Sequence, residues 1–164
     1  MNWQPNITPS DRAFSVLPYI MPIIEAIALS LTAAGPTNSI LIQVPIFQPL
    51  LVILAPIMQI YLGVPFASFI IFILLFLLVV RNDKISRFIR YNTMQAIMLD
   101  IVVFLCGLII RVVFAPIGGF IVQTLASTVF LGILVGSIYS IVQSVRGEYA
   151  EIPTISDAVQ MQIR

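Results

Sequence analysis

Histidine is absent from the 164 residues, and cysteine occurs only once, at Cys106. Without histidine the chain lacks the usual general base and the commonest metal ligand. A single cysteine excludes an intrachain disulfide and any multi-cysteine metal site. The sequence also lacks a P-loop, a GxSxG elbow and an HExxH pair. We therefore expect no catalytic residue, no metal and no cofactor, and we predict that the protein is not an enzyme.

Charge is also scarce, because only 9% of residues are charged and 60% are hydrophobic. The mean hydropathy is +1.08, whereas soluble domains are about one quarter charged. A soluble domain of this size leaves roughly a third of its unfolded surface exposed, so it could not hide so much apolar area. The composition predicts an integral membrane protein whose first partner is the lipid bilayer. The net charge of +1, with no basic block, argues against a nucleic-acid partner.

Long apolar runs predict the fold class. A membrane-spanning helix needs about 20 apolar residues. We predict an all-α, polytopic membrane protein with four transmembrane helices, at about 13–31, 61–80, 93–114 and 120–142. Residues 40–60 are apolar too, but they contain Pro45, Pro49 and Pro56. Interior prolines leave carbonyls without a hydrogen bond, so we expect an interfacial or re-entrant segment there.

The distribution of basic residues predicts the topology. Arg81, Lys84, Arg87 and Arg90 form one cluster, whereas the connection from Thr32 to Val64 has no charge. By the positive-inside rule, the cluster determines which loops are cytoplasmic or stromal. We place residues 1–12 and 146–164 on that side as tails, with one membrane domain at 13–145 between them. The C-terminal tail should contain a short surface helix with Ser156 as its N-cap and Ile155, Val159 and Ile163 on its apolar face.

Five polar residues within the membrane domain are candidates for a functional interior: Glu25, Asn92, Gln95, Asp100 and Arg111. Asp100 lies on one stripe of the third helix with Thr93, Ala96, Gly107 and Arg111. A carboxylate facing lipid would be costly, so this stripe should face protein or water. Asp100 and Arg111 are about 16 Å apart along the helix and cannot pair directly. These residues act either as clamps between helices or as the lining of a wet pathway.

The fourth helix has a ladder of small residues at a spacing of four: Thr124, Thr128, Gly132, Gly136, Ser140 and Ser144. Such spacing lets two helix backbones approach closely. The partner is either another helix of this chain or a second copy, and the pattern does not choose between them.

Several motifs together resemble a known family. They are Leu17-Pro18-Tyr19, Pro65 to Ser68, "RFIRYN" at 87–92 followed by Met94-Gln95-Ala96, and Tyr149 to Pro153. The chain resembles, over residues 17–164, the twenty-kilodalton subunit family of the translocon at the inner envelope of chloroplasts, especially its cyanobacterial and plastid-encoded members. The resemblance implies four membrane helices with both ends in the stroma. It also implies a role as a core, channel-forming part of the machinery that moves preproteins across that membrane.

Three functional hypotheses follow. The first is a non-enzymatic component of a protein-translocation machinery, which forms a channel with partners and contacts translocating polypeptides. The second is a membrane scaffold or assembly protein, bound to other membrane subunits or to itself. The third is a small ion or solute transporter, in which Glu25 and Asp100 meet within hydrogen-bonding reach. The expected location is the plastid inner envelope for a plastid-encoded chain, and otherwise the plasma or thylakoid membrane of a cyanobacterium.

Overall fold

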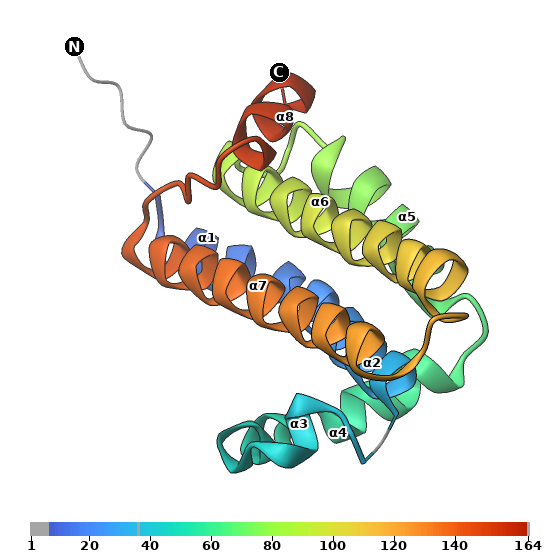
Figure 1. Ribbon diagram of the computed structural model, residues 1–164. Coiled ribbons are helices and arrows are strands. Elements are labelled where there is room, and N and C mark those ends of the chain that lie inside the picture. The colour runs from blue at the N-terminus through green and yellow to red at the C-terminus, as the bar shows by residue number, and fades with distance from the viewer. Residues whose placement is uncertain (1–6, 36, 164) are drawn as a thin grey trace.

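The computed structural model describes residues 7–35 and 37–163, and its regular secondary structure within these ranges is entirely helical (Figure 1). Most of the expected N-terminal tail, residues 1–6, and the last residue of the expected C-terminal tail lie outside the described ranges. The elements in chain order are α1 (Pro9–Val16), η1 (Leu17–Tyr19), α2 (Ile20–Ala34), α3 (Ile40–Gln43), η2 (Pro45–Phe47), α4 (Gln48–Gly63), α5 (Ala67–Leu74), η3 (Leu75–Val80), α6 (Arg87–Ile109), η4 (Ile110–Phe114), α7 (Gly119–Arg146) and α8 (Ile155–Gln162).

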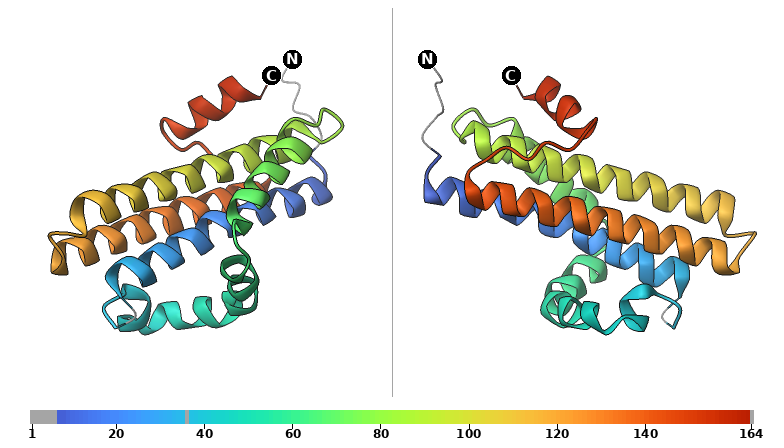
Figure 2. Two further views of the ribbon diagram at one scale, coloured as in Figure 1. Left: turned by 90° about the vertical axis from the view of Figure 1, so that its right-hand side faces the viewer. Right: turned by 60° about the vertical axis from the view of Figure 1, so that its left-hand side comes forward.

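Three long helical units lie side by side and form the core (Figures 1 and 2). They are α1–η1–α2, α6 with η4, and α7, and α2 packs against both of the others. Apolar side chains fill the space between them, among them Ile27, Ala96 and Phe130, none more than 1% exposed. Tyr19 is buried in the same cluster, and its hydroxyl therefore needs a polar partner inside the bundle.

The first unit starts before the predicted residue 13. Thr8 caps α1 in a capping box, in which its hydroxyl accepts from the Asp11 amide and the Asp11 carboxylate accepts from the Thr8 amide. Pro18 lies in the 3₁₀ turn η1. A proline has no amide hydrogen and crowds the carbonyl four residues earlier, so a local 3₁₀ turn is a natural response.

The proline-rich segment is helical, and it lies to one side of the three long units (Figure 2). Pro45 and Pro49 lie in the first turns of η2 and α4, where an amide would have no partner within the helix. Only Pro56 is interior. Phe47 anchors the segment through an edge-to-face contact with Phe130 at 5.3 Å.

The predicted fold class is confirmed: the chain is an all-α, multi-pass membrane protein. Four helices among the described residues are long and apolar enough to cross a membrane, at Pro9–Ala34, Pro45–Gly63, Arg87–Phe114 and Gly119–Arg146. The first, third and fourth of these helices extend beyond the predicted spans, because a helix continues beyond the apolar core while its backbone groups remain hydrogen-bonded within it. The helix Pro45–Gly63 of the proline-rich segment is one of these four. The next apolar helix, Ala67–Val80, is shorter than these four.

The predicted single helix over 61–80 is wrong in its first part. Tyr61, Leu62 and Gly63 end α4, and the next helix begins at Ala67. Val64 is extended, at φ −97° and ψ 121°, because the residue before a proline avoids helical geometry and Pro65 follows. Phe66 then has a positive φ of 59°. This break separates the proline-rich helix from the segment Ala67–Val80.

The C-terminal tail folds back onto the start of α6, where α8 packs. Val159 and Ile163 of its predicted apolar face are buried, and Ile155 packs beside them. The predicted N-cap was wrong: Thr154 precedes the helix, and Ser156 lies inside it. Ser156 has a different task, because its hydroxyl accepts a hydrogen bond from the Ile152 amide at 2.7 Å.

Candidate functional site

A buried polar cluster joins the three long helical units near the basic end of the bundle. The Tyr19 hydroxyl lies 3.0 Å from Asn92 Oδ1 and 2.9 Å from Gln95 Oε1, and its single proton is shared between these two acceptors. The Ser144 hydroxyl donates to Asn92 Oδ1 at 2.7 Å. Tyr19, Asn92, Gln95 and Ser144 are all fully buried, and we call these four side chains, with Ser156, the polar brace.

The amide groups of the brace have fixed orientations. Asn92 Nδ2 donates to the Phe88 carbonyl of its own helix at 2.9 Å, which turns Oδ1 toward Tyr19 and Ser144. Gln95 Nε2 donates to the Ala150 carbonyl at 3.2 Å and to the Ser156 hydroxyl at 3.4 Å. Both amides thus use donor and acceptor together, which is what burial of an amide requires.

The same cluster holds the C-terminal tail against α6. The Tyr91 hydroxyl donates to the Ala150 carbonyl at 3.1 Å, so this carbonyl also accepts from α6 through a second side chain. The Tyr149 ring packs edge-to-face on Phe88 and Tyr91, with centroids 5.2 and 4.9 Å away. Burial raises the pKa of the Tyr149 phenol above its ordinary value, because desolvation disfavours the charged form. The tail is therefore docked by polar and aromatic contacts together.

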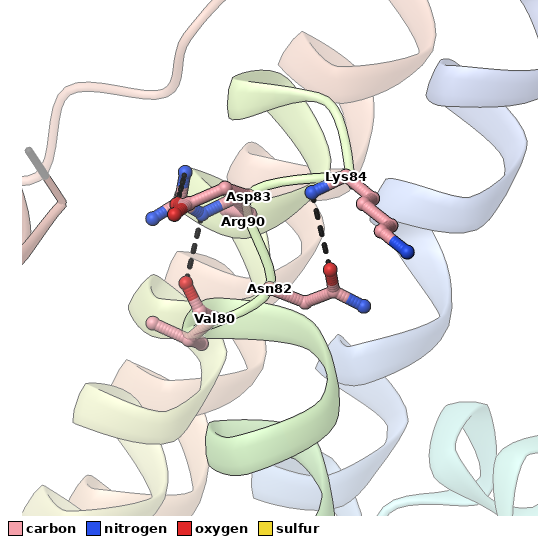
Figure 3. Close-up of polar contacts among 5 residues, drawn as sticks. All are labelled: Val80, Asn82, Asp83, Lys84 and Arg90. Carbon is pink, nitrogen blue, oxygen red and sulfur yellow. Dashed lines mark hydrogen bonds and ion pairs between the residues drawn. The ribbon is translucent and has the colours of Figure 1, made fainter.

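The three basic regions predicted to share one side do meet at one end. Arg12 Nη1 lies 3.5 Å from the Val145 carbonyl. In the 81–90 loop, Arg90 donates to the Val80 carbonyl at 2.8 Å and pairs with Asp83 at 3.1 Å (Figure 3). Arg90 thereby ties the end of η3 to the start of α6. Arg81, Lys84 and Arg87 remain exposed on the same loop.

Glu25, Asp100 and Arg111 lie farther along the bundle and do not join the brace. Glu25 Oε1 accepts a hydrogen bond from the Tyr61 hydroxyl at 3.0 Å, which links α2 to α4. Asp100 is 9% exposed, and its Oδ1 has no hydrogen-bond partner among the described residues. Arg111 is exposed, and its guanidinium lies 3.4 Å from the Thr32 hydroxyl. As expected from their spacing, no ion pair joins Asp100 and Arg111 in the described part of the chain.

The ladder of α7 divides into two halves. Ser140 and Ser144 are buried, and a Cβ on Gly136 would lie 3.9 Å from Leu99 and Ile152. At the other end Thr124, Thr128 and Gly132 are exposed, and a Cβ on Gly132 would meet nothing within 4 Å. The inner half thus serves packing within the chain, and the outer half presents small residues on the surface.

On α6, Gly107 lies closer to a neighbouring helix than either glycine of the ladder does. A Cβ on Gly107 would lie 3.3 Å from Leu29 Cδ1 of α2. We expect Gly107→Leu to destabilise the protein by about 1–3 kcal/mol, as overpacking does. Gly132→Leu is the matched control, and it should leave stability unchanged or higher because leucine favours a helix over glycine. Thermal unfolding of both variants in detergent checks this, and equal losses would contradict it.

Sequence reasoning selected Asn92 and Gln95 but missed three of their partners. Tyr19, Ser156 and the Ala150 carbonyl are 73, 61 and 55 residues away from the brace residues they contact. Tyr61, the partner of Glu25, was also missed. The available signal was the tyrosine of Leu17-Pro18-Tyr19, a hydroxyl within an apolar helix, which needs a buried partner.

The sequence is similar to a known family and to several of its members. Residues 8–159 match the family described as "Chloroplast import apparatus Tic20-like". The chain is 47% identical to a Tic20 family protein of Synechocystis sp. over 94% of this chain and 93% of that protein. It is 35% identical to "Protein TIC 20-v, chloroplastic" of Arabidopsis thaliana, over 96% of this chain and 73% of the relative.

A third relative is the Tic20 family protein Ycf60 of the alga Gracilaria tenuistipitata var. liui, with 33% identity over 96% of this chain and 78% of that protein. The matched residues 8–159 contain the long helices, the basic loop and the whole polar brace. These matches confirm the predicted resemblance. The chain, a multi-pass membrane protein with these motifs, belongs to the Tic20 family.

Proposed function

We propose that the chain is a non-enzymatic subunit of a protein-translocation machinery, of the kind at the chloroplast inner envelope, and that it contributes one wall of a path built with partners or further copies. Its membership in the Tic20 family carries the proposal, since the description of the family refers to the chloroplast import apparatus and the Arabidopsis relative is named as chloroplastic. The geometry supports a wall, because the polar residues at the basic end bind one another instead of lining an open conduit.

The brace supplies the rigidity that such a wall needs. It fixes the three long helical units and the C-terminal tail in one arrangement at the basic end. Farther from that end the residues Gly132, Thr128 and Thr124 are exposed on α7. Small residues there let another helix or an extended polypeptide approach the α7 backbone closely. We therefore assign the contact with partners or passing chains to this outer half of α7.

A scaffold or assembly role is the second candidate, favoured by the same exposed half of the ladder. It differs from the first in needing contact with other subunits only, and never with a polypeptide in transit. The ion-transporter alternative needs Glu25 and Asp100 to meet. In the described residues Glu25 is bonded to Tyr61, and no hydrogen bond joins the two carboxyl groups. This geometry does not favour the transporter.

Crosslinking from the outer half of α7 tests the proposal. Gly132→Cys, in a background with Cys106→Ala, is placed in native membranes that hold a precursor protein arrested in transit. We expect adducts to the arrested precursor. Ser137→Cys is the control, because Ser137 is fully buried and should remain unreactive. Adducts from position 132 to other subunits alone would support the scaffold, and the absence of protein adducts would contradict both roles.

A further inference from the structure

An apolar groove of about 560 Å³ opens beside the bundle, between the first long helical unit and the helices that follow the proline-rich segment. One wall includes Phe14, Leu17 and Ile24, and the opposite wall includes Ile71, Leu75 and Val79. Its volume falls within the roughly 300–1,000 Å³ of sites that hold small molecules. The polar brace and the acidic side chains of Glu25 and Asp100 are not part of its lining.

The length of the groove fits one membrane leaflet. Its lining runs along the first helical unit from Phe14 to Ile24, which is about 15 Å at 1.5 Å per residue. The hydrocarbon core of a bilayer is about 30 Å thick, so the groove extends over about half of it. A transmembrane helix of a partner would need the full thickness, whereas the acyl chain of a lipid occupies one leaflet.

The charge at the end of the groove indicates the kind of headgroup. Ile85 and Ile89 line the groove within the basic loop, next to the exposed Lys84 and Arg87. Asp83 is already paired with Arg90, and the Lys84 ammonium extends away from that pair (Figure 3). In the described part of the chain, no carboxylate lies within 4.0 Å of the Arg81, Lys84 or Arg87 cationic groups. An anion at this end would meet unneutralised positive charge.

A second feature of the wall is a polar group without a partner. Thr93 is one of the lining residues and is fully buried, and its hydroxyl oxygen has no hydrogen-bond partner among the described residues. A buried hydroxyl without a partner is unfavourable. An ester oxygen of a glycerolipid would accept its proton once the Thr93 side chain turns toward the groove, whereas an aliphatic side chain of a partner helix offers no acceptor.

We propose that this groove binds one anionic glycerolipid from the leaflet at the basic end, with an acyl chain between the two walls and a phosphate or sulfonate headgroup at Arg81 and Lys84. The bound lipid connects the first helical unit to the short helix Ala67–Val80. This proposal does not depend on the translocation role, because the groove, its length and its charge are properties of the chain by itself.

Photoactivatable lipids in nanodiscs test the proposal. The protein is reconstituted in phosphatidylcholine with a trace of phosphatidylglycerol or phosphatidylcholine that carries the same photoreactive acyl chain. We expect phosphatidylglycerol adducts to concentrate on groove residues. The double variant Arg81→Gln/Lys84→Gln should lower that yield about fivefold per charge removed, and phosphatidylcholine adducts should not change. Arg146→Gln is the charge control, because Arg146 lies outside the groove and pairs with Glu148.

A second pair of variants tests the acyl chain separately from the headgroup. Leu17→Trp fills the groove from an exposed wall position, whereas Leu78→Trp adds the same ring at an exposed position outside it. Leu17→Trp should reduce groove adducts of both lipids several-fold, and Leu78→Trp should not. Equal yields of the two lipids with no effect of the charge variants would overturn the proposal. A photoreactive residue at position 71 that captures protein instead of lipid in native membranes would also overturn it.

Discussion

Replacement of Gln95 by alanine should lower the stability of the protein by about 2 kcal/mol or more and release its C-terminal tail. The side chain accepts from Tyr19 and donates to the Ala150 carbonyl and to Ser156. Alanine removes these hydrogen bonds inside a fully buried site and leaves a cavity. For a domain of this size, such a loss corresponds to a fall in Tm of about 4–8 °C in detergent.

The control for this variant is Gln143→Ala, the same change at a half-buried position of α7. Gln143 makes one weak contact, with the Tyr139 hydroxyl at 3.4 Å, so the change should cost no more than about 0.5 kcal/mol. Limited proteolysis should cleave the Gln95→Ala protein faster between Gly147 and Thr154, where the tail leaves the bundle. Equal Tm values and equal cleavage rates for the two variants would show that the brace does not hold the tail.

The helices that could be predicted are those in which one physical effect dominates. Over 93–114 and 120–142 the free energy of transferring apolar residues into lipid is the dominant contribution. Both predicted spans lie inside helical segments of the structure. The interruption at Val64–Phe66 was missed because hydropathy continues through it. The signal there is local, since Pro65 disfavours a helical conformation at the residue before it.

The candidate site could be predicted in part only. Asn92 and Gln95 were selected because polar groups within a membrane domain need partners. Their partners on other helices depend on how those helices pack, and the pattern along one helix does not contain that information. The ladder of α7 shows the same limit. Thr124 and Ser144 belong to one ladder with a spacing of four, yet one is exposed and the other buried. A spacing of four drifts by about 40° per step around a helix of 3.6 residues per turn, so the ladder turns from the covered face of α7 to its exposed face.

The buried brace and the exposed outer half of the ladder on α7 fit the proposed role as one subunit of a larger assembly. The brace concentrates hydrogen bonds at the basic end, where Arg12 and the 81–90 loop also meet. Farther from the basic end, hydrogen bonds between helices are isolated, as from Tyr61 to Glu25 and from Arg111 to Thr32, and apolar packing supplies most other contacts. Such packing is weakly directional in lipid and therefore permits other helices to exchange contacts there. A rigid base with an adaptable opposite end is consistent with a wall that is completed by partners.

A pair of cysteine substitutions on either side of the proline-rich segment should show opposite accessibility from outside the membrane. The helix Pro45–Gly63 is long and apolar enough to cross a bilayer, so the number of crossings between Thr37 and Lys84 decides the topology. If α4 and Ala67–Val80 together make one crossing, the two positions lie on opposite faces. If each crosses separately, both positions lie on the same face.

We expect one crossing, because no charge lies between Thr32 and Val64, whereas four basic residues lie between Arg81 and Arg90. Thr37→Cys should react with an impermeant thiol reagent in sealed membranes that enclose the cytoplasmic or stromal face. Lys84→Cys and Gln160→Cys should react only after permeabilisation, all in a Cys106→Ala background. The three positions are exposed in the structure, so burial does not explain protection. Identical labelling of positions 37 and 84 would mean that the proline-rich helix crosses the membrane by itself. The helices α6 and α7 would then cross the membrane in directions opposite to those expected here, relative to the first helical unit.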